Sequence, residues 1–244
     1  MTNHVLLDNI SHKDLRIKPG FSAELGDNIS YTVAFADEFR QLQSDYPIFL
    51  RKNSQTAQFE AIALLGFADN ENLFVTEQGW DGAYIPLTIK RRPFLIGFQN
   101  VVEDGVSSQN PVVHIDMDSP RISQTQGHPI FSAHGGNSPY LEEINSILLE
   151  IYNGTEQSKT FADLLIEFNL LEAFTLKISL EDNSDIELVG FYTINEEKLA
   201  ALGTVELAKL HQQGYLQHIY MMIASQNNIP VMIEKKNHSL RVKS

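Results

Sequence analysis

The spacing of hydrophobic and polar residues changes near the middle of the chain, and it predicts strands before that point and mainly helices after it. Short runs of β-branched and aromatic residues in the first half are typical of strands. The strands expected there are 31–35, 46–50, 59–67, 73–75, 94–101 and 112–117. Short helices are expected at 37–44 and 86–92, and the second of these begins at Pro86 and ends before Pro93.

Polar stretches without apolar periodicity are expected to form the loops. The two glycines of 78–82 predict a loop, and the polar residues 103–110 predict a turn. Residues 119–137 are rich in Ser, Gln, Gly and Pro and predict a long loop. We expect a single domain over 1–244, in which this loop can join subdomains 1–120 and 138–244.

An amphipathic helix is predicted after Ser138, which is a favourable N-cap residue followed by proline at the first helical position. Leu141, Ile144, Leu148 and Ile151 recur at helical spacing and fall on one face. Asn153-Gly154 is expected to break this helix, and a second helix of the same kind is expected at 161–168.

The rest of the second half predicts a hairpin and several helices. The hairpin strands are 174–180 and 186–194, and the helical segments are 195–202, 205–212 and 215–227. A last strand is expected at 231–234, followed by a solvated, mobile basic tail at 235–243. The expected fold class is therefore α+β, with a strand-rich N-terminal half and helices plus a β-hairpin in the C-terminal half.

Composition and charge narrow the class of protein. The chain has 244 residues, 43% of them hydrophobic and 20% charged, which is typical of a soluble globular protein. Its 18 Lys and Arg face 31 Asp and Glu, so the formal net charge is −13. Such a charge repels phosphate backbones and anionic lipids, and no nucleic-acid partner is expected.

Cysteine and long apolar segments are both absent from the sequence. The lack of cysteine excludes disulfides and thiolate chemistry. The longest apolar runs, 61–68 and 219–224, are far shorter than the roughly 18–20 residues that cross a bilayer. The first residues lack the basic and apolar regions of a secretory signal, so a cytoplasmic location is expected.

One short motif suggests metal chemistry. His114 and Asp116 are two residues apart on a predicted strand, so their side chains share one face. With one more histidine they would form the two-His, one-carboxylate face that binds Fe(II) in oxygenases. The candidates for that third ligand are His128, His134, His211 and His218, and we assign His134 to the third position. The alternative is a plain strand end.

Apart from this alternative, the sequence predicts no catalytic residues and no cofactor. It contains no glycine-rich nucleotide loop, no H-E-x-x-H zinc motif and no G-x-S-x-G nucleophile elbow.

A cluster of three cations, Lys90-Arg91-Arg92, is the densest basic cluster of this acidic chain. It can bind a carboxylate or phosphate, or it can complement the C-terminal end of a short helix. Trp80 and Tyr84 in the preceding segment can form a recognition surface or cover an edge of the core. The candidate ligand-binding residues are Trp80, Tyr84, Arg91, Arg92 and Asp116.

Several sequence blocks, spaced in order between Val33 and Ile233, resemble those of the bacterial SapC-like family. The blocks are Glu38-Phe39, Asp45-Tyr-Pro-Ile-Phe49, Ala63-Leu-Leu-Gly66, Glu71-Asn-Leu-Phe74, Trp80, Ala83-Tyr-Ile-Pro86, Arg91-Arg-Pro-Phe94, Ile115-Asp116, Ser119-Pro120, Ile219-Tyr220 and Ser225-Gln-Asn-Asn228. The missing membrane segments distinguish the chain from a peptide-transporter permease that shares the family's name.

The resemblance suggests a biological role for the protein but no chemical reaction. The family takes its name from a paracrystalline surface layer, and many relatives are encoded near halogenase-like flavoproteins, cupin-like proteins and outer-membrane receptors. It therefore implies a non-catalytic accessory or binding protein linked to nutrient uptake or to a flavin-dependent halogenase-type partner. The alternatives are a surface-layer component at the cell surface and the Fe(II)-dependent oxygenase. Asp116 fits the family pattern, whereas His114 is not a usual residue there.

Overall fold

The structure is a computed structural model that describes residues 3–103 and 106–243. Its strands are β1 (His4–Leu6), β2 (Arg16–Ile17), β3 (Tyr31–Val33), β4 (Ile48–Lys52), β5 (Phe59–Leu64), β6 (Val75–Thr76), β7 (Gly79–Trp80), β8 (Phe94–Glu103), β9 (Val106–Asp116), β10 (Ile122–Ser123), β11 (His128–Pro129), β12 (Leu171–Ser179) and β13 (Asp185–Ile194).

The helices lie mainly in the second half of the chain. They are α1 (Phe39–Leu42), α2 (Leu87–Lys90), α3 (Pro139–Glu167), α4 (Glu196–Ala200), α5 (Thr204–Gln212), α6 (Tyr215–Ser225) and α7 (Ile229–Lys243), with 3-10 turns η1 (Ala23–Leu25), η2 (Ala36–Glu38) and η3 (Gln226–Asn228). The predicted α+β class, with its strand-rich N-terminal half, is confirmed.

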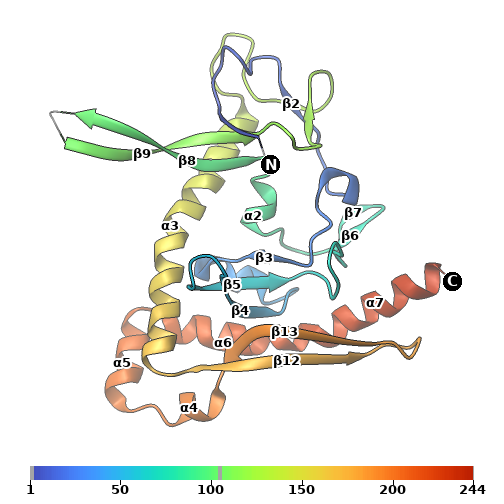
Figure 1. Ribbon diagram of the computed structural model, residues 1–244, viewed down its shortest axis with the longest axis vertical. Coiled ribbons are helices and arrows are strands. Elements are labelled where there is room, and N and C mark those ends of the chain that lie inside the picture. The colour runs from blue at the N-terminus through green and yellow to red at the C-terminus, as the bar shows by residue number, and fades with distance from the viewer. Residues whose placement is uncertain (1–2, 104–105, 244) are drawn as a thin grey trace.

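The largest sheet joins residues from both halves of the chain (Figure 1). Its strand order is β12-β13-β4-β5-β3, and every pair is antiparallel. The late hairpin β12–β13, predicted from the sequence, attaches to the early strands where Phe191 pairs with Arg51 and Tyr192 with Leu50. Helix α6 packs on β4 and β13, and α3 packs on β5.

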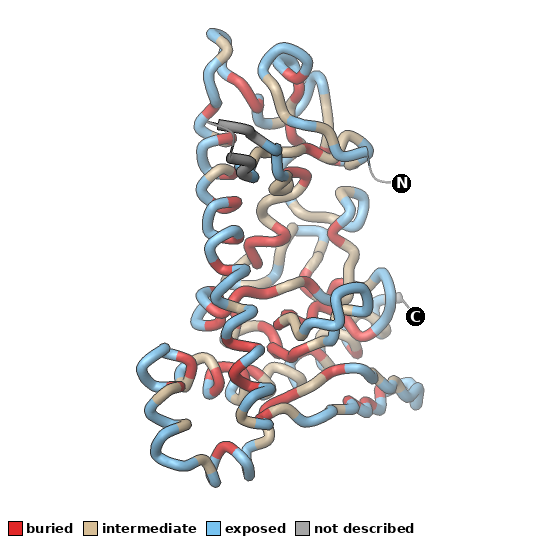
Figure 2. Tube along the Cα trace, turned by 60° about the vertical axis from the view of Figure 1, so that its left-hand side comes forward, coloured by how far each residue is buried: buried red, intermediate tan, exposed pale blue. Residues whose placement is uncertain are grey.

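The long helix α3 connects two hydrophobic clusters. Its first half contributes Leu141, Ile144, Ile147, Leu148 and Ile151 to a cluster with Phe94 and Ile115. Its second half contributes Phe161, Leu164 and Leu165 to the cluster around the large sheet. Buried residues accordingly occur in both the upper and the lower part of the molecule (Figure 2).

The break expected at Asn153-Gly154 was wrong, because α3 continues from Pro139 to Glu167. Ser138 caps it as expected, since its Oγ accepts a hydrogen bond from the Leu141 N–H at 3.2 Å. Gly154 faces Phe35, and a Cβ added there would lie 3.1 Å from the Phe35 Cβ. The glycine therefore permits close packing in the helix interior and does not end the helix.

The turn expected at 103–110 was also wrong for most of its residues. Strands β8 and β9 pair from Phe94–Ile115 out to Glu103–Val106, so the hairpin extends well beyond the body of the protein (Figure 1). Residues 104–105 lie outside the described residues. The ladder continues because polar residues are tolerated in strands that are not buried on both faces.

The prediction of a strand at 231–234 and a mobile tail at 235–243 was wrong, because both segments belong to the single helix α7. Pro230 is compatible with helix at this position, because the first N–H groups of a helix have no partner within it. Three basic residues of the helix form ion pairs: Lys235 with Asp81, Lys236 with Glu71, and Arg241 with Glu181. Tertiary contacts thus order a segment that reads locally as strand and tail.

The loop expected at 119–137 is mostly irregular but contains β10 and β11, which pair on either side of β2. Near it, β1 pairs with the end of β9. These pairings bring the N-terminal segment next to α2 and the start of α3, where the candidate site lies.

Candidate functional site

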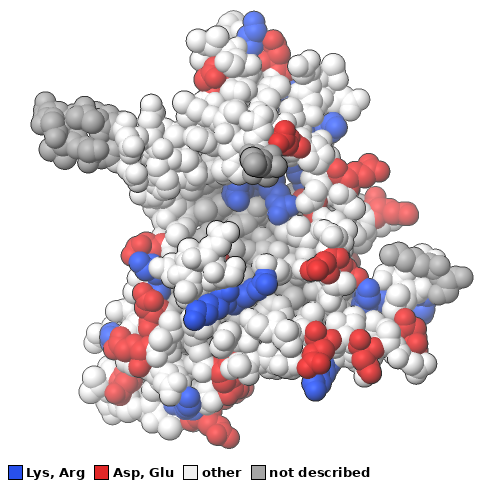
Figure 3. All heavy atoms as spheres, in the orientation of Figure 1, with Lys and Arg blue, Asp and Glu red and all other residues white. Residues whose placement is uncertain are grey.

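A small cavity lies between α2, the start of α3 and the segments around β2 and β10. It has a volume of about 260 Å3 and is lined by Lys18, Lys90, Arg92 and Arg121, together with Tyr140 and Glu143 of α3. We call it the basic pocket. In the space-filling view, Lys and Arg atoms lie in a hollow over the region of α2, and most atoms around them are uncharged (Figure 3).

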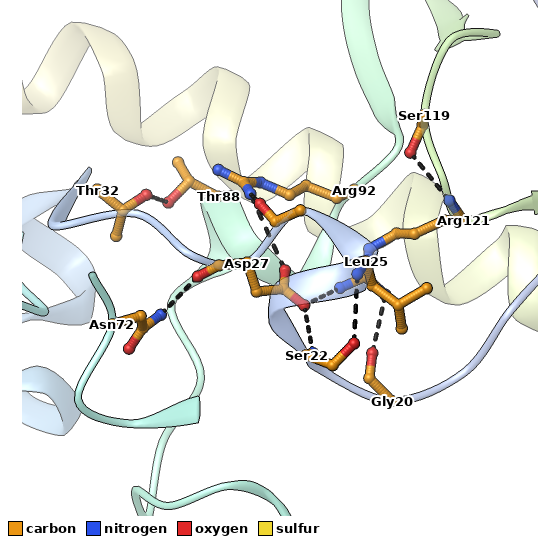
Figure 4. Close-up of polar contacts among 11 residues, drawn as sticks. Gly20, Ser22, Leu25, Asp27, Thr32, Asn72, Thr88, Arg92, Ser119 and Arg121 are labelled. Carbon is orange, nitrogen blue, oxygen red and sulfur yellow. Dashed lines mark hydrogen bonds and ion pairs between the residues drawn. The ribbon is translucent and has the colours of Figure 1, made fainter. Parts of the chain in front are cut away.

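Asp27 holds the two arginines of the basic pocket, and both point toward it from separate segments (Figure 4). Its carboxylate is fully buried, and Oδ2 lies 2.5 Å from Arg121 Nη2. Arg92 Nη1 lies 3.9 Å from Oδ1 and donates to the Gly26 carbonyl at 2.7 Å. Arg121 Nη1 donates to the Gly20 carbonyl at 2.8 Å. Both guanidinium groups are therefore fixed by backbone carbonyls and share one carboxylate.

The electrostatic balance of this cluster is positive. Burial lowers the pKa of Arg92, Asp27 opposes that effect, and the nearby charge of Arg121 lowers the pKa further. Asp27 Oδ1 and Arg121 Nε are buried and have no hydrogen-bond partner within the described part of the chain. Two like charges with one shared carboxylate make a site that an added anion would stabilise.

The two lysines of the basic pocket form no ion pair with a carboxylate among residues 3–103 and 106–243. Lys90 Nζ lies 5.0 Å from the centre of the Tyr84 ring, a cation–π distance. Lys18 Nζ donates to the Pro120 carbonyl at 3.2 Å. Both ammonium groups can therefore turn toward a ligand without breaking an ion pair.

The remaining walls of the basic pocket are apolar or aromatic. Ile85, Ile144 and Ile147 line it, and the Tyr140 ring stacks with His128 at a centroid distance of 5.1 Å. Burial raises the pKa of Tyr140 to about 12, so its hydroxyl stays protonated at neutral pH and can donate a hydrogen bond. An anion with a short apolar body fits this combination of walls.

Of the predicted binding residues, Arg92 lines the basic pocket, whereas Trp80 and Tyr84 support the surrounding structure. Trp80 Nε1 donates to the Tyr46 hydroxyl at 2.8 Å, and its ring packs edge-on against Phe21 at 5.5 Å. The Tyr84 hydroxyl donates to Glu38 Oε1 at 3.0 Å.

Arg91 and Asp116 do not line the pocket either. Arg91 Nη1 donates to the Phe94 carbonyl, and burial lowers the pKa of this guanidinium. Asp116 Oδ1 accepts from the Asp118 N–H at 3.1 Å at the end of β9. The three neighbouring cations therefore differ in position. Lys90 and Arg92 line the pocket, whereas Arg91 binds a backbone carbonyl.

The ligands of the alternative iron site do not come together within the described residues. The His114 ring lies over Gly97, where an added Cβ would come within 2.5 Å of ring atoms. In the described ranges, no three His, Asp or Glu side chains gather as metal ligands, and this includes His114, Asp116 and His134.

Sequence reasoning missed Lys18, Arg121 and Tyr140. Each is an isolated residue in its own segment, and neither spacing nor a local motif marks it. The pairing of β2 with β10 brings the segments of Lys18 and Arg121 together, and Tyr140 joins them from the start of α3.

A second, larger cavity of about 650 Å3 lies between the β8–β9 hairpin and α3. Its lining is mainly apolar and includes Leu6, Ile96, Val113, Leu148 and Tyr152. Its described lining contains no lysine or arginine, so it differs in chemistry from the basic pocket.

Fold and site together define an α+β protein with a small, cation-lined pocket. The chain belongs to the SapC family, whose family model matches residues 7–232, and this confirms the resemblance seen in the sequence blocks. No curated protein and no solved structure matches the chain. Among the helices of the described residues, none is long and apolar enough to span a membrane.

Proposed function

We propose that this SapC-family protein is a non-catalytic binding protein whose ligand is a small organic anion held in the basic pocket. One observation supports this most strongly: Lys18, Lys90, Arg92 and Arg121 line a single small cavity in a chain of net charge −13. Guanidinium and ammonium groups bind carboxylates and phosphates through charge-assisted hydrogen bonds.

The size and walls of the basic pocket limit the ligand. Its volume of about 260 Å3 lies below the roughly 300–1,000 Å3 of pockets for drug-sized ligands, so the ligand is small. The isoleucine wall suits a short hydrocarbon body beside the acidic group. Because water is partly excluded there, each ionic contact is stronger than it would be on an open surface.

Isothermal titration calorimetry with phenyl phosphate, succinate and benzoate tests the proposal, with benzamide as the neutral comparison. We expect saturable binding of at least one anion and none of benzamide. Lys90→Gln should weaken anion binding, because it removes a cation that has no structural ion pair. Lys159→Gln is the matched control, since it removes an exposed lysine that does not line the pocket. Absence of saturable anion binding, or equal losses in the two variants, would refute the proposal.

A binding role is compatible with the accessory function that the family resemblance suggests. In this proposal the protein supplies or holds a ligand for a partner, either a halogenase-like flavoprotein or a cupin-like protein, during nutrient uptake. Affinity purification of the tagged protein from its host, with and without the ligand, tests this role. Recovery of the protein in an extracted surface-layer fraction would favour the surface-layer alternative.

A further inference from the structure

We propose that the ligand of the basic pocket is a doubly charged anion without a cationic group, such as a phosphate monoester or a short dicarboxylate. The inference rests on the proposed binding function and adds the charge of the ligand to it. It follows from the balance of charges around the cavity.

Four cations and two carboxylates make up that balance. Lys18, Lys90, Arg92 and Arg121 line the cavity, whereas Asp27 lies behind the arginines and Glu143 lines the cavity from α3. Four cations thus face two carboxylates, so at least two positive charges lack a counter-ion among the residues that line the cavity or pair with its lining. The buried carboxylate of Glu38 attracts Lys90 from outside this set. A singly charged ligand would leave one of the two positive charges unmatched in a partly desolvated site, and a doubly charged ligand would match both.

The pocket combines two fixed arginines with two flexible lysines, and this combination suits an anion with several oxygen atoms. Arg121 is 4% exposed and its Nε has no acceptor among the described residues, although Nη1 and Nη2 are both engaged. Arg92 is held by the Gly26 carbonyl. The two lysines carry no ion pair in the described part of the chain, so their flexible ammonium groups can follow oxygen atoms that the fixed arginines do not reach.

Glu143 offers only weak attraction to a ligand that carries an ammonium group. It is the only carboxylate among the described lining residues, and it is exposed to solvent on α3. Water screens such a charge, so it attracts a ligand cation only weakly. In this proposal Glu143 mildly repels the ligand, whereas a zwitterionic ligand would use it as a partner.

Matched pairs of anions test the charge of the ligand by calorimetry. Succinate is compared with its monoamide succinamate, and phenyl phosphate with methyl phenyl phosphate, which carries one charge. We expect the doubly charged member of at least one pair to bind about tenfold more tightly, a difference of about 1.4 kcal/mol. The pair that shows this preference distinguishes a dicarboxylate from a phosphate monoester.

Three variants complete the experiment. Lys90→Gln should reduce the preference for the doubly charged member, and Lys159→Gln should leave it unchanged. Glu143→Gln should tighten anion binding, because it removes a like charge from the lining; weaker anion binding would contradict this charge balance and overturn the proposal. Equal affinities within both pairs would also overturn it while leaving the binding function intact. If no anion of either pair binds, the proposed function itself fails.

Discussion

Arg121 Nη2 lies 2.5 Å from Asp27 Oδ2, in an ion pair whose side chains are 5% and 0% exposed. The pair joins the segment after η1 to the segment before β10, and the backbone N–H of Ser22 also donates to Oδ2, at 3.0 Å. It therefore both fixes the wall of the basic pocket and places a cation in that wall.

Asp27→Asn should destabilise the protein by about 3–5 kcal/mol, because it leaves buried guanidinium charge without its counter-ion. Urea denaturation followed by circular dichroism measures the change. The double variant Asp27→Asn/Arg121→Met is the control, and it should lose less than the sum of its single changes because the two residues are in contact. Additive losses would show that the ion pair does not couple the two segments.

Glu38→Gln should destabilise the protein by about 1–3 kcal/mol, the cost of leaving a buried polar group unpaired. Glu38 is 3% exposed; its Oε1 accepts from the Leu87 N–H at 2.8 Å and its Oε2 from the Phe35 N–H at 3.2 Å. An amide offers only one acceptor oxygen for these donors. Tyr84→Phe removes only one hydrogen bond to Glu38 and should cost less, which a thermal melt of both variants can check.

The pKa of Glu38 adds a pH dependence to the same site. Burial raises this pKa, although hydrogen bonds from Leu87, Phe35 and Tyr84 oppose the effect. The folded state then holds the Glu38 proton more firmly than the unfolded state. The stability linked to this proton is therefore present at acidic pH and is lost as the pH rises through the folded-state pKa. Unfolding free energies of wild type and Glu38→Gln, measured from about pH 4 to about pH 8, should differ in slope in that direction.

His218 should make the protein less stable in mild acid. Burial among Phe39, Phe161 and Tyr215 lowers its pKa, and Asp37 only partly opposes this. Because the unfolded state takes up the proton more readily, stability is full above the usual pKa of 6.5 and is lost as the pH falls toward the folded-state pKa. His218→Phe should reduce the difference between urea midpoints at about pH 5 and about pH 8. An unchanged difference would contradict this assignment.

The ion pairs of α7 should contribute unequally to the unfolding free energy of the protein. The side chains of Lys236 and Glu71 are 15% and 18% exposed, whereas those of Arg241 and Glu181 are 52% and 55% exposed. Solvent screens the second pair more strongly, so it should contribute less to stability than the first. Lys236→Gln should therefore lower the unfolding free energy more than Arg241→Gln does, and added salt should affect mainly the second pair. Equal losses would contradict this ranking.

Periodic patterns predicted the fold wherever one face of an element is buried. Leu141, Ile144 and Leu148 indicated the first half of α3, and the apolar runs around the polar residues 181–185 indicated the hairpin β12–β13. In both cases the apolar positions of the pattern are the buried positions of the folded element, so the pattern predicts the element correctly.

Local signals failed where distant residues decide the conformation. Asn153-Gly154 is a typical helix-breaking pair, but the helix continues through it, and Gly154 lies close against Phe35. The short apolar run 231–233 suits a strand or a helix equally, and contacts of α7 such as Lys236–Glu71 decide for the helix. The extension of β8–β9 past Val101 depends on cross-strand pairing, which the polar residues of 103–110 do not reveal.

The candidate site was predictable only in part, for a similar reason. Lys90 and Arg92 were detectable because they are neighbouring cations in an acidic chain. Arg121 and Lys18 are single cations whose role arises from strand pairing about a hundred positions apart in the sequence, at β2 and β10. Asp27, which holds the arginines, carries no local signal of its burial.

The attachment of β13 to β4 has a consequence for synthesis on the ribosome. Strand β4 ends at Lys52, and its partner strand begins only at Asp185. While the intervening residues are being translated, the early strands emerge with one edge unpaired and with Phe49 still lacking its neighbours Phe174 and Phe191. That edge therefore closes only after the C-terminal third of the chain has emerged, and until then an apolar strand edge stays open to pairing with other chains.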